Sequence, residues 1–153
     1  MIIISPYARL LRNGSTKHPK NYPYWDELIP LIKELDDVCQ VGAGEEKALP
    51  GISDFHLNLS LKDLAVLIKE CKTWVSVDSF FQHYCWDQGK KGVVLWGQSD
   101  PNIFGHPENI NLLKSRKYLR EKQFWLWEQT TYNPDAFVEP GTVIQVIKQL
   151  LYP

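Results

Sequence analysis

This 153-residue sequence lacks the features that mark several large classes of protein. Its formal net charge at pH 7 is -1 and its 17 Lys and Arg residues form no stripe, so nucleic acid is not an expected partner. No apolar run approaches the length of a membrane span. The apolar start, residues 1–6, is too short for a signal peptide and has no basic segment. We therefore expect a cytoplasmic protein without a membrane span.

Cysteine is scarce, and internal repeats and long linkers are absent. Cys39, Cys71 and Cys85 have no C-x-x-C spacing, and each lies in an apolar segment. This distribution predicts reduced core thiols in preference to a disulfide or a metal site. A chain of this length can bury roughly 70% of the surface that its unfolded form exposes, which is enough for one core. Residues 1–153 are therefore expected to form a single domain.

The sequence does contain an alternation of strand and helix patterns. Short β-branched or apolar runs predict strands, and apolar residues at helical spacing predict helices between them. The expected strands are 2–4, 38–41, 56–59, 75–77, 93–96 and an edge strand at 110–113, and the expected helices are 23–35, 61–68, 79–88 and 142–151. Near-continuous Val and Leu in the strands indicates a parallel sheet covered on both faces. The predicted fold class is α/β, a Rossmann-like domain with helices on both sides of the sheet.

The most informative segment runs from Trp74 to His83. It predicts a buried strand that ends just before Asp78 and Ser79, which lie at the start of a helix, with His83 one turn into that helix. Helix N-termini carry unpaired N–H groups and a partial positive charge, so they suit phosphate. Ligands of open α/β sheets bind outside the carboxyl ends of the strands. We therefore expect an anion site at this point, and a plain loop at 97–101.

Four segments in order resemble one enzyme family, glycosyltransferase family 9, the ADP-heptose:lipopolysaccharide heptosyltransferases. They are 15–25, with Ser-Thr, a lysine and an aromatic-proline helix start; the glycine turn 42–46; the helix 59–68; and Asp-Ser-x-x-x-His at 78–83. The resemblance covers roughly residues 10–105 and is to the C-terminal, nucleotide-sugar-binding half of a two-domain GT-B fold. It implies one nucleotide-sugar-binding domain over residues 1–153.

Four residues are candidates for contact with the donor diphosphate. This group leaves during transfer, so its site must stabilise growing negative charge. The resemblance implies that Ser15, Thr16 and Lys20 contact it, and Ser79 offers an amide and a hydroxyl at a helix start. Two plainer interpretations stay open. Lys20 would then be a solvated lysine, and Ser15 and Thr16 would form a turn with the preceding Asn-Gly pair.

The resemblance assigns the nucleoside and the sugar to other residues. It implies that Glu46, or alternatively Glu45, binds the ribose, that Asp78 holds a sugar hydroxyl, and that His83 lies against the phosphate or the sugar. Asp78 could equally be a helix N-cap, and His83 a core histidine. Alanine at Asp78 or at His83 is expected to weaken nucleotide binding with little loss of fold.

The sequence also departs from the family. Nothing in it matches the acceptor-binding half that carries the catalytic base, so no residue is assigned as catalytic. Phe80 and Phe81 put bulk where the family has a small residue. Four of the six tryptophans could form an exposed docking patch or pack in the core: Trp86, Trp96, Trp125 and Trp127.

The predicted function is donor binding for glycosyl transfer. An ADP-sugar is the favoured donor, no metal or other cofactor is expected, and a homodimer or a separate acceptor-domain chain would complete the site. Catalysis by this chain alone stays open. The alternatives are a non-catalytic module that binds or senses a nucleotide or nucleotide-sugar, and a scaffold with a degenerate pocket.

Overall fold

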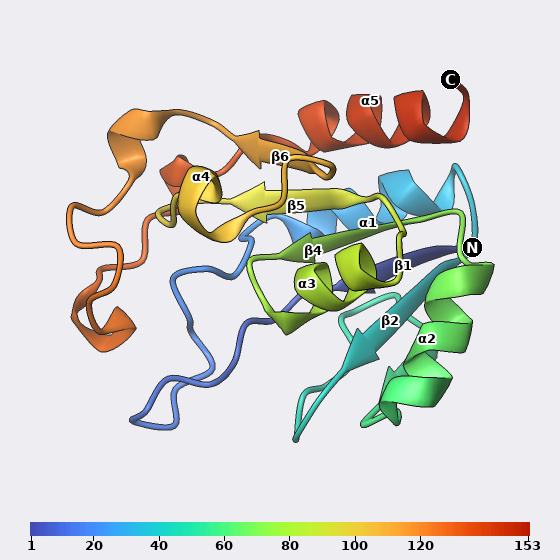
Figure 1. Ribbon diagram of the computed structural model, residues 1–153, viewed down its shortest axis with the longest axis horizontal. Coiled ribbons are helices and arrows are strands. Elements are labelled where there is room, and N and C mark those ends of the chain that lie inside the picture. The colour runs from blue at the N-terminus through green and yellow to red at the C-terminus, as the bar shows by residue number, and fades with distance from the viewer.

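Six parallel strands form the frame of the molecule, which a computed structural model describes over residues 1–153 (Figure 1). They are β1 (Ile2–Ser5), β2 (Val38–Gly42), β3 (Asp54–Leu57), β4 (Thr73–Val77), β5 (Val93–Trp96) and β6 (Ile110–Leu113). Their order in the sheet is β3-β2-β1-β4-β5-β6, and every neighbouring pair is parallel. This is the strand order of the Rossmann fold, so the predicted fold class is confirmed.

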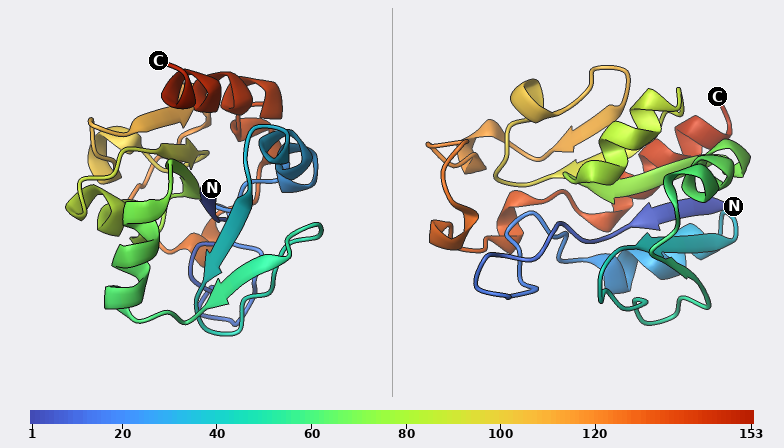
Figure 2. Two further views of the ribbon diagram at one scale, coloured as in Figure 1. Left: turned by 90° about the vertical axis from the view of Figure 1, so that its right-hand side faces the viewer. Right: turned by 60° about the horizontal axis from the view of Figure 1, so that its bottom comes forward.

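Helices cover both faces of the sheet (Figure 2). One face packs against α1 (Trp25–Lys33) and α5 (Pro140–Leu151), and the other against α2 (Leu61–Glu70) and α3 (Phe80–Asp87). A short helix, α4 (Pro101–Phe104), follows β5, and three 3-10 turns lie at Arg116–Tyr118, Trp127–Gln129 and Pro134–Ala136. None of the helices has the combination of length and apolar character that a transmembrane span needs.

Alternation along the strands divides the core in two. Ile2 and Ile4 of β1 pack on the α1/α5 face, while Ile3 between them packs on the α2/α3 face. On the second face the rings of Trp74 and Phe81 meet edge to face at 5.7 Å. Because both faces are buried, strand residues pointing either way are apolar, which explains the near-continuous apolar runs in the sequence.

Several predicted boundaries move by one or two residues. The third strand ends at Leu57 because Asn58 adopts a left-handed conformation with φ 57°, which breaks the extended backbone. The first helix begins at Trp25, so Pro23 lies outside it. The predicted cap of the second helix is confirmed, since Ser60 Oγ accepts a hydrogen bond of 3.1 Å from the Asp63 amide.

Helical structure extends beyond the predicted helices at two places. Pro140 occupies the first turn of α5, two residues before the predicted start of this helix, because proline has no N–H to lose there and its φ suits a helix. The predicted plain loop at 97–101 runs into the short helix α4, which is capped by Asp100, whose side chain accepts a hydrogen bond of 2.9 Å from the Asn102 amide. Asp100 also pairs with Arg116, the two side chains meeting at 2.7 Å. This carboxylate therefore anchors the loops beyond β5.

The sequence predicted burial of the cysteines but left the burial of four tryptophans open. All three cysteines are free and buried, as predicted, and burial, helped by the Asp54 carboxylate, raises the pKa of the Cys39 thiol to about 12. The tryptophans divide between the two alternatives, because Trp96 is fully buried in the core under α3, whereas Trp86 and Trp125 are substantially exposed.

Candidate functional site

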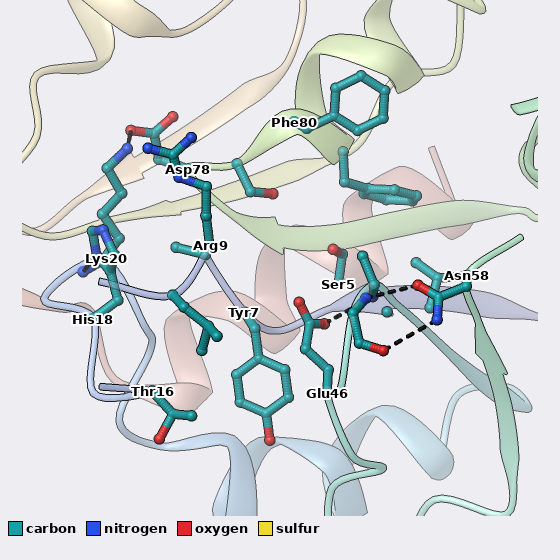
Figure 3. Close-up of a pocket in the computed structure, with 18 of the residues that line it drawn as sticks. Ser5, Tyr7, Arg9, Thr16, His18, Lys20, Glu46, Asn58, Asp78 and Phe80 are labelled. Carbon is teal, nitrogen blue, oxygen red and sulfur yellow. Dashed lines mark hydrogen bonds and ion pairs between the residues drawn. The ribbon is translucent and has the colours of Figure 1, made fainter. Parts of the chain in front are cut away.

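A cleft of about 1240 Å³ lies at the carboxyl ends of β1, β2 and β4 (Figure 3). The chain leaves β1 toward α1 on one face of the sheet and leaves β4 toward α3 on the other. Neighbouring strands whose connections diverge in this way leave a crevice between their loops, and this is where ligands of such sheets bind. The topology therefore places the cleft where the sequence predicts an anion site.

The cleft gathers most of the predicted site residues. Those that line it are Thr16, Lys20, Glu45, Glu46, Asp78, Ser79 and His83. Ser15 is not among them: its amide donates to Asn13 Oδ1 at 2.9 Å, and its Oγ accepts from the Lys17 amide at 3.2 Å. The turn interpretation therefore describes Ser15, whose side chain closes its own loop.

Lys20 and Asp78 meet in an ion pair inside the cleft. Lys20 Nζ lies 3.0 Å from Asp78 Oδ2, and Asp78 is only 5% exposed. The same oxygen accepts from Ser99 Oγ at 3.1 Å, and Oδ1 accepts from Gln82 Nε2 at 2.8 Å. Asp78 is therefore the centre of a buried polar network and not a helix N-cap. Lys20 is not merely solvated, and its ammonium keeps two N–H donors beyond the one used by Asp78.

The start of α3 lacks polar partners. Ser79 is the N-cap residue in an extended conformation, but its side chain makes no capping hydrogen bond. Its Oγ is buried and has no hydrogen-bond partner. The first-turn amides of any α-helix also lack intrahelical acceptors. An anion held here would accept from both the hydroxyl and the amides, at the positive end of the helix dipole.

A glycine turn after β2 brings a carboxylate to the opposite wall. A side chain at Gly42 would place its Cβ 2.9 Å from Glu46 Oε2 and 3.1 Å from the Phe55 ring, so it would displace the Glu46 carboxylate. Glu46 Oε2 accepts from the Ala43 amide at 3.2 Å, and burial raises the pKa of Glu46. Gly44, with φ 64°, donates to Asn58 Oδ1 at 2.7 Å and accepts from Asn58 Nδ2 at 3.1 Å. The turn is thus locked, with Glu46 half-buried on the cleft wall.

His83 is exposed at the rim of the cleft, so it is not a core histidine. Its Nδ1 lies 2.7 Å from Nε2 of His106, whose ring stacks on Trp86 with centroids 4.2 Å apart. Partial burial, and then the neighbouring His106, lower the pKa of His83. His83 is therefore biased toward its neutral form, and its implied contact with phosphate or sugar stays a prediction.

Phe80 and Phe81 occupy different environments. Phe81 is buried in the core against Trp74, while Phe80 is 61% exposed and stacks on Tyr84 with centroids 5.6 Å apart. Both rings contribute to the lining of the cleft. Only Phe80 is therefore a large, accessible apolar surface at the start of α3.

Three residues of the cleft are not among the predicted site residues. Arg9 extends from the loop after β1 into the side of the cleft that holds Lys20 (Figure 3). His18 is 6% exposed, and its Nδ1 accepts from the Lys20 amide at 3.1 Å. The ring of Trp127 lies 5.2 Å from both the His18 ring and Lys20 Nζ, and 3.4 Å from the Arg120 guanidinium carbon. No local pattern marks them, because their position depends on contacts across the chain.

His18 should make the fold sensitive to mild acid. Burial, and then the neighbouring Lys20, lower the pKa of His18 to about 4. Between that value and its ordinary pKa of about 6.5, the unfolded chain binds a proton that the folded chain does not, so stability falls as pH falls through this window. Between pH 7 and pH 4.5 we expect this group to remove about 2 kcal/mol from the free energy of unfolding.

Urea denaturation at the two pH values measures this effect. His18→Gln cannot titrate, so it should lose about 2 kcal/mol less stability than the parent over the same interval. The other groups that titrate between these pH values change the stability of both proteins equally, so their contributions cancel in the comparison. A proton-NMR titration that gives His18 a pKa near its ordinary value would contradict the assignment.

The chain is similar in sequence to one known family. The family model for glycosyltransferase family 9 (heptosyltransferase) matches residues 5–125. A search of the curated proteins gives no match.

Solved structures with the same fold agree with this match. E. coli ADP-heptose lps heptosyltransferase II superposes with a TM-score of 0.64 at 18% identity, covering 99% of this chain and 46% of that one. E. coli heptosyltransferase WaaC with ADP gives 0.63 at 18% identity, with coverages of 97% and 44%. The family 9 glycosyl transferase from Veillonella parvula DSM 2008 gives 0.69 at 20% identity, with coverages of 99% and 46%. This chain therefore spans less than half the length of these three structures.

Proposed function

Since this chain belongs to glycosyltransferase family 9, we propose that it binds a nucleotide-diphosphate sugar and supplies the donor half of a glycosyl transfer reaction. The observation that carries this proposal is the convergence of Lys20 with the uncapped start of α3. Lys20 is paired with Asp78 but keeps free N–H donors, and the helix start adds unpaired amides beside a buried hydroxyl that has no partner. A diphosphate is the part of the donor that such a corner would hold.

The remaining walls suit the rest of the donor. We propose that Glu46 accepts hydrogen bonds from ribose hydroxyls, because its carboxylate faces the cleft and has only the Ala43 amide as a partner. Apolar side chains that line the cleft, among them Leu10, Leu59 and Phe80, offer a surface to the base. Similar structures are named for ADP-heptose or contain ADP, which makes an ADP-sugar the first donor to test.

Asp78 is proposed to act by positioning Lys20. Both of its oxygens already accept hydrogen bonds or an ion pair from protein groups. The Asp78 carboxylate therefore fixes the position of the Lys20 ammonium, whose free N–H groups can then reach the phosphates. We also propose that Asp78 contacts a sugar hydroxyl, because Asp78 lines the cleft.

In this proposal the chemistry is direct displacement at the anomeric carbon. The departing diphosphate gains charge, and Lys20 with the start of α3 stabilises that charge without a metal ion. The acceptor hydroxyl and the base that takes its proton must face the donor from outside this cleft. We propose that a second half supplies them, on a partner chain or in a homodimer. The three reduced cysteines fit a cytoplasmic location.

Nucleotide binding tests the proposal directly. At a ligand concentration 100 times Kd, a ligand of the folded state adds about 2.7 kcal/mol of stability, which raises Tm by roughly 5–10 °C for a domain of this size. We expect ADP and an ADP-sugar to produce this rise, and adenosine to produce little or none. UDP- and GDP-sugars in the same thermal-shift series report base preference. Calorimetry that detects no binding of any nucleotide diphosphate at millimolar concentration would refute the proposal.

A further inference from the structure

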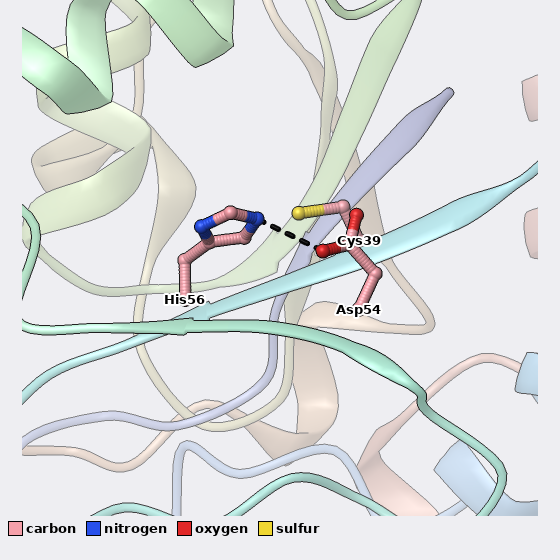
Figure 4. Close-up of side chains that lie close together, drawn as sticks. All are labelled: Cys39, Asp54 and His56. Atoms are coloured by element: carbon pink, nitrogen blue, oxygen red, sulfur yellow. Dashed lines mark hydrogen bonds and ion pairs between the residues drawn. The ribbon is translucent and has the colours of Figure 1, made fainter.

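Three potential metal ligands of different chemistry lie together at one edge of the sheet (Figure 4). They are Cys39 on β2, and Asp54 and His56 on β3. The thiol sulfur, one carboxylate oxygen and one imidazole nitrogen all lie within 4.8 Å of one another. His56 Nε2 is 2.9 Å from Asp54 Oδ1.

The strand register itself creates this grouping. Cys39 pairs directly with Asp54 across the parallel ladder, and Val41 pairs with His56. Side chains two residues apart on a strand point to the same face, so His56 lies on the same side as Asp54. The donors therefore come from two hydrogen-bonded strands and not from flexible loops.

The combination of donors matches the preferences of zinc. Zn²⁺ binds thiolate, imidazole nitrogen and carboxylate oxygen at about 2.0–2.3 Å, so ligands around a tetrahedral ion lie about 3.3–3.8 Å apart. Donors within 4.8 Å of one another can reach this spacing by small side-chain movements. Cys39 is buried, whereas His56 and Asp54 are 39% and 53% exposed. An ion could enter from the solvent side and keep a water as its fourth ligand.

We propose that Cys39, Asp54 and His56 form a zinc site that joins the edge strand β3 to β2. This site goes beyond donor binding, and it revises the sequence-based expectation that the chain has no metal site. The other two cysteines offer no comparable environment, because Cys71 and Cys85 lie in the apolar core beneath α2 and α3.

The position of the site suggests what the ion does. No residue of β3 is buried, so this strand is held mainly by its backbone ladder with β2. A metal ion with ligands on both strands adds a cross-link at the edge with the least side-chain packing. The ion takes the place of the thiol proton, which passes to solvent, and its binding energy stabilises the folded state.

Metal titration of the full chain, first stripped with a chelator, tests the site. Calorimetry should show one Zn²⁺ bound per chain, and zinc at 100 times Kd should raise Tm by roughly 5–10 °C. Co²⁺, used as a spectroscopic substitute, should give a thiolate-to-metal charge-transfer band. Cys39→Ser should abolish this band. His56→Ala should weaken Zn²⁺ binding by roughly 10- to 100-fold or more, since loss of even an outer partner of a ligand costs this much.

Matched variants separate this site from adventitious binding. Cys71→Ser and His106→Ala remove a thiol and an imidazole elsewhere, and both should keep the stoichiometry and the band. Absence of Zn²⁺ binding by the parent, or an unchanged band in Cys39→Ser, would overturn the proposal. If Cys39→Ser does not fold, Asp54→Asn and His56→Ala decide the matter, because both side chains are partly exposed. Unchanged Zn²⁺ affinity in both would also overturn it.

Discussion

Replacement of Asp78 by alanine should lower the free energy of unfolding by roughly 3 kcal/mol, because loss of one partner leaves the others of a buried network unpaired. Asp78 is 5% exposed and accepts from Gln82 and Ser99 while it pairs with Lys20. In the variant, the Gln82 side-chain amide loses its hydrogen-bond acceptor. Gln82 is fully buried, and its Oε1 already lacks a partner. Sequence alone predicts little loss of fold for this substitution, so the two expectations differ clearly.

Urea denaturation at neutral pH measures this change. Asp78→Asn retains an oxygen for Gln82 but removes the charge, so it should fall between Asp78→Ala and the parent. Asp87→Ala, at the exposed end of the same helix, is the control and should change stability by no more than about 0.5 kcal/mol. Stability of Asp78→Ala within the range of that control would show that the network contributes little.

Replacement of Lys20 by alanine should weaken ADP binding by about 10- to 100-fold. A hydrogen bond to a charged group contributes roughly 1.5–3 kcal/mol, and each 1.4 kcal/mol is a factor of ten in Kd. The loss has two parts in this cleft. The ammonium no longer contacts phosphate, and the Asp78 carboxylate, which lies 3.0 Å from Lys20 Nζ in the parent, is left without its counter-ion near the ligand.

Calorimetric titration with ADP and with adenosine isolates the phosphate contribution, since the variant should lose affinity for ADP alone. Lys17→Ala is the matched control: Lys17 belongs to the same loop, is exposed and does not line the cleft, so its affinity for ADP should match the parent. Equal ADP affinity for Lys20→Ala and the parent would remove Lys20 from the diphosphate site. A denaturation curve for each variant confirms that the comparison is made between folded proteins.

Much of the architecture could be predicted because its causes are local. Apolar runs such as 93–96 and the cap at Ser60 depend on residues within one turn or one strand, and both appear as expected. Boundaries moved where backbone conformation outweighed composition, as at Asn58, whose positive φ ends β3 before the apolar pattern does. The sequence left the tryptophans open between core and surface for a related reason. The sequence shows that Trp96 is large and apolar, but it does not show whether packing on either face of the sheet will bury this ring.

The sequence by itself determined the parallel α/β fold and the positions of Asp78 and Ser79 at a strand-to-helix junction, because periodicity and helix-start signals act over a few residues. Only the tertiary structure decided how the candidate site is assembled. Lys20 reaches Asp78 across 58 positions, Trp127 comes from a segment without periodicity, and Cys39 meets Asp54 through strand register. Such contacts depend on how distant segments pack on the sheet, and no local pattern of residues encodes that packing.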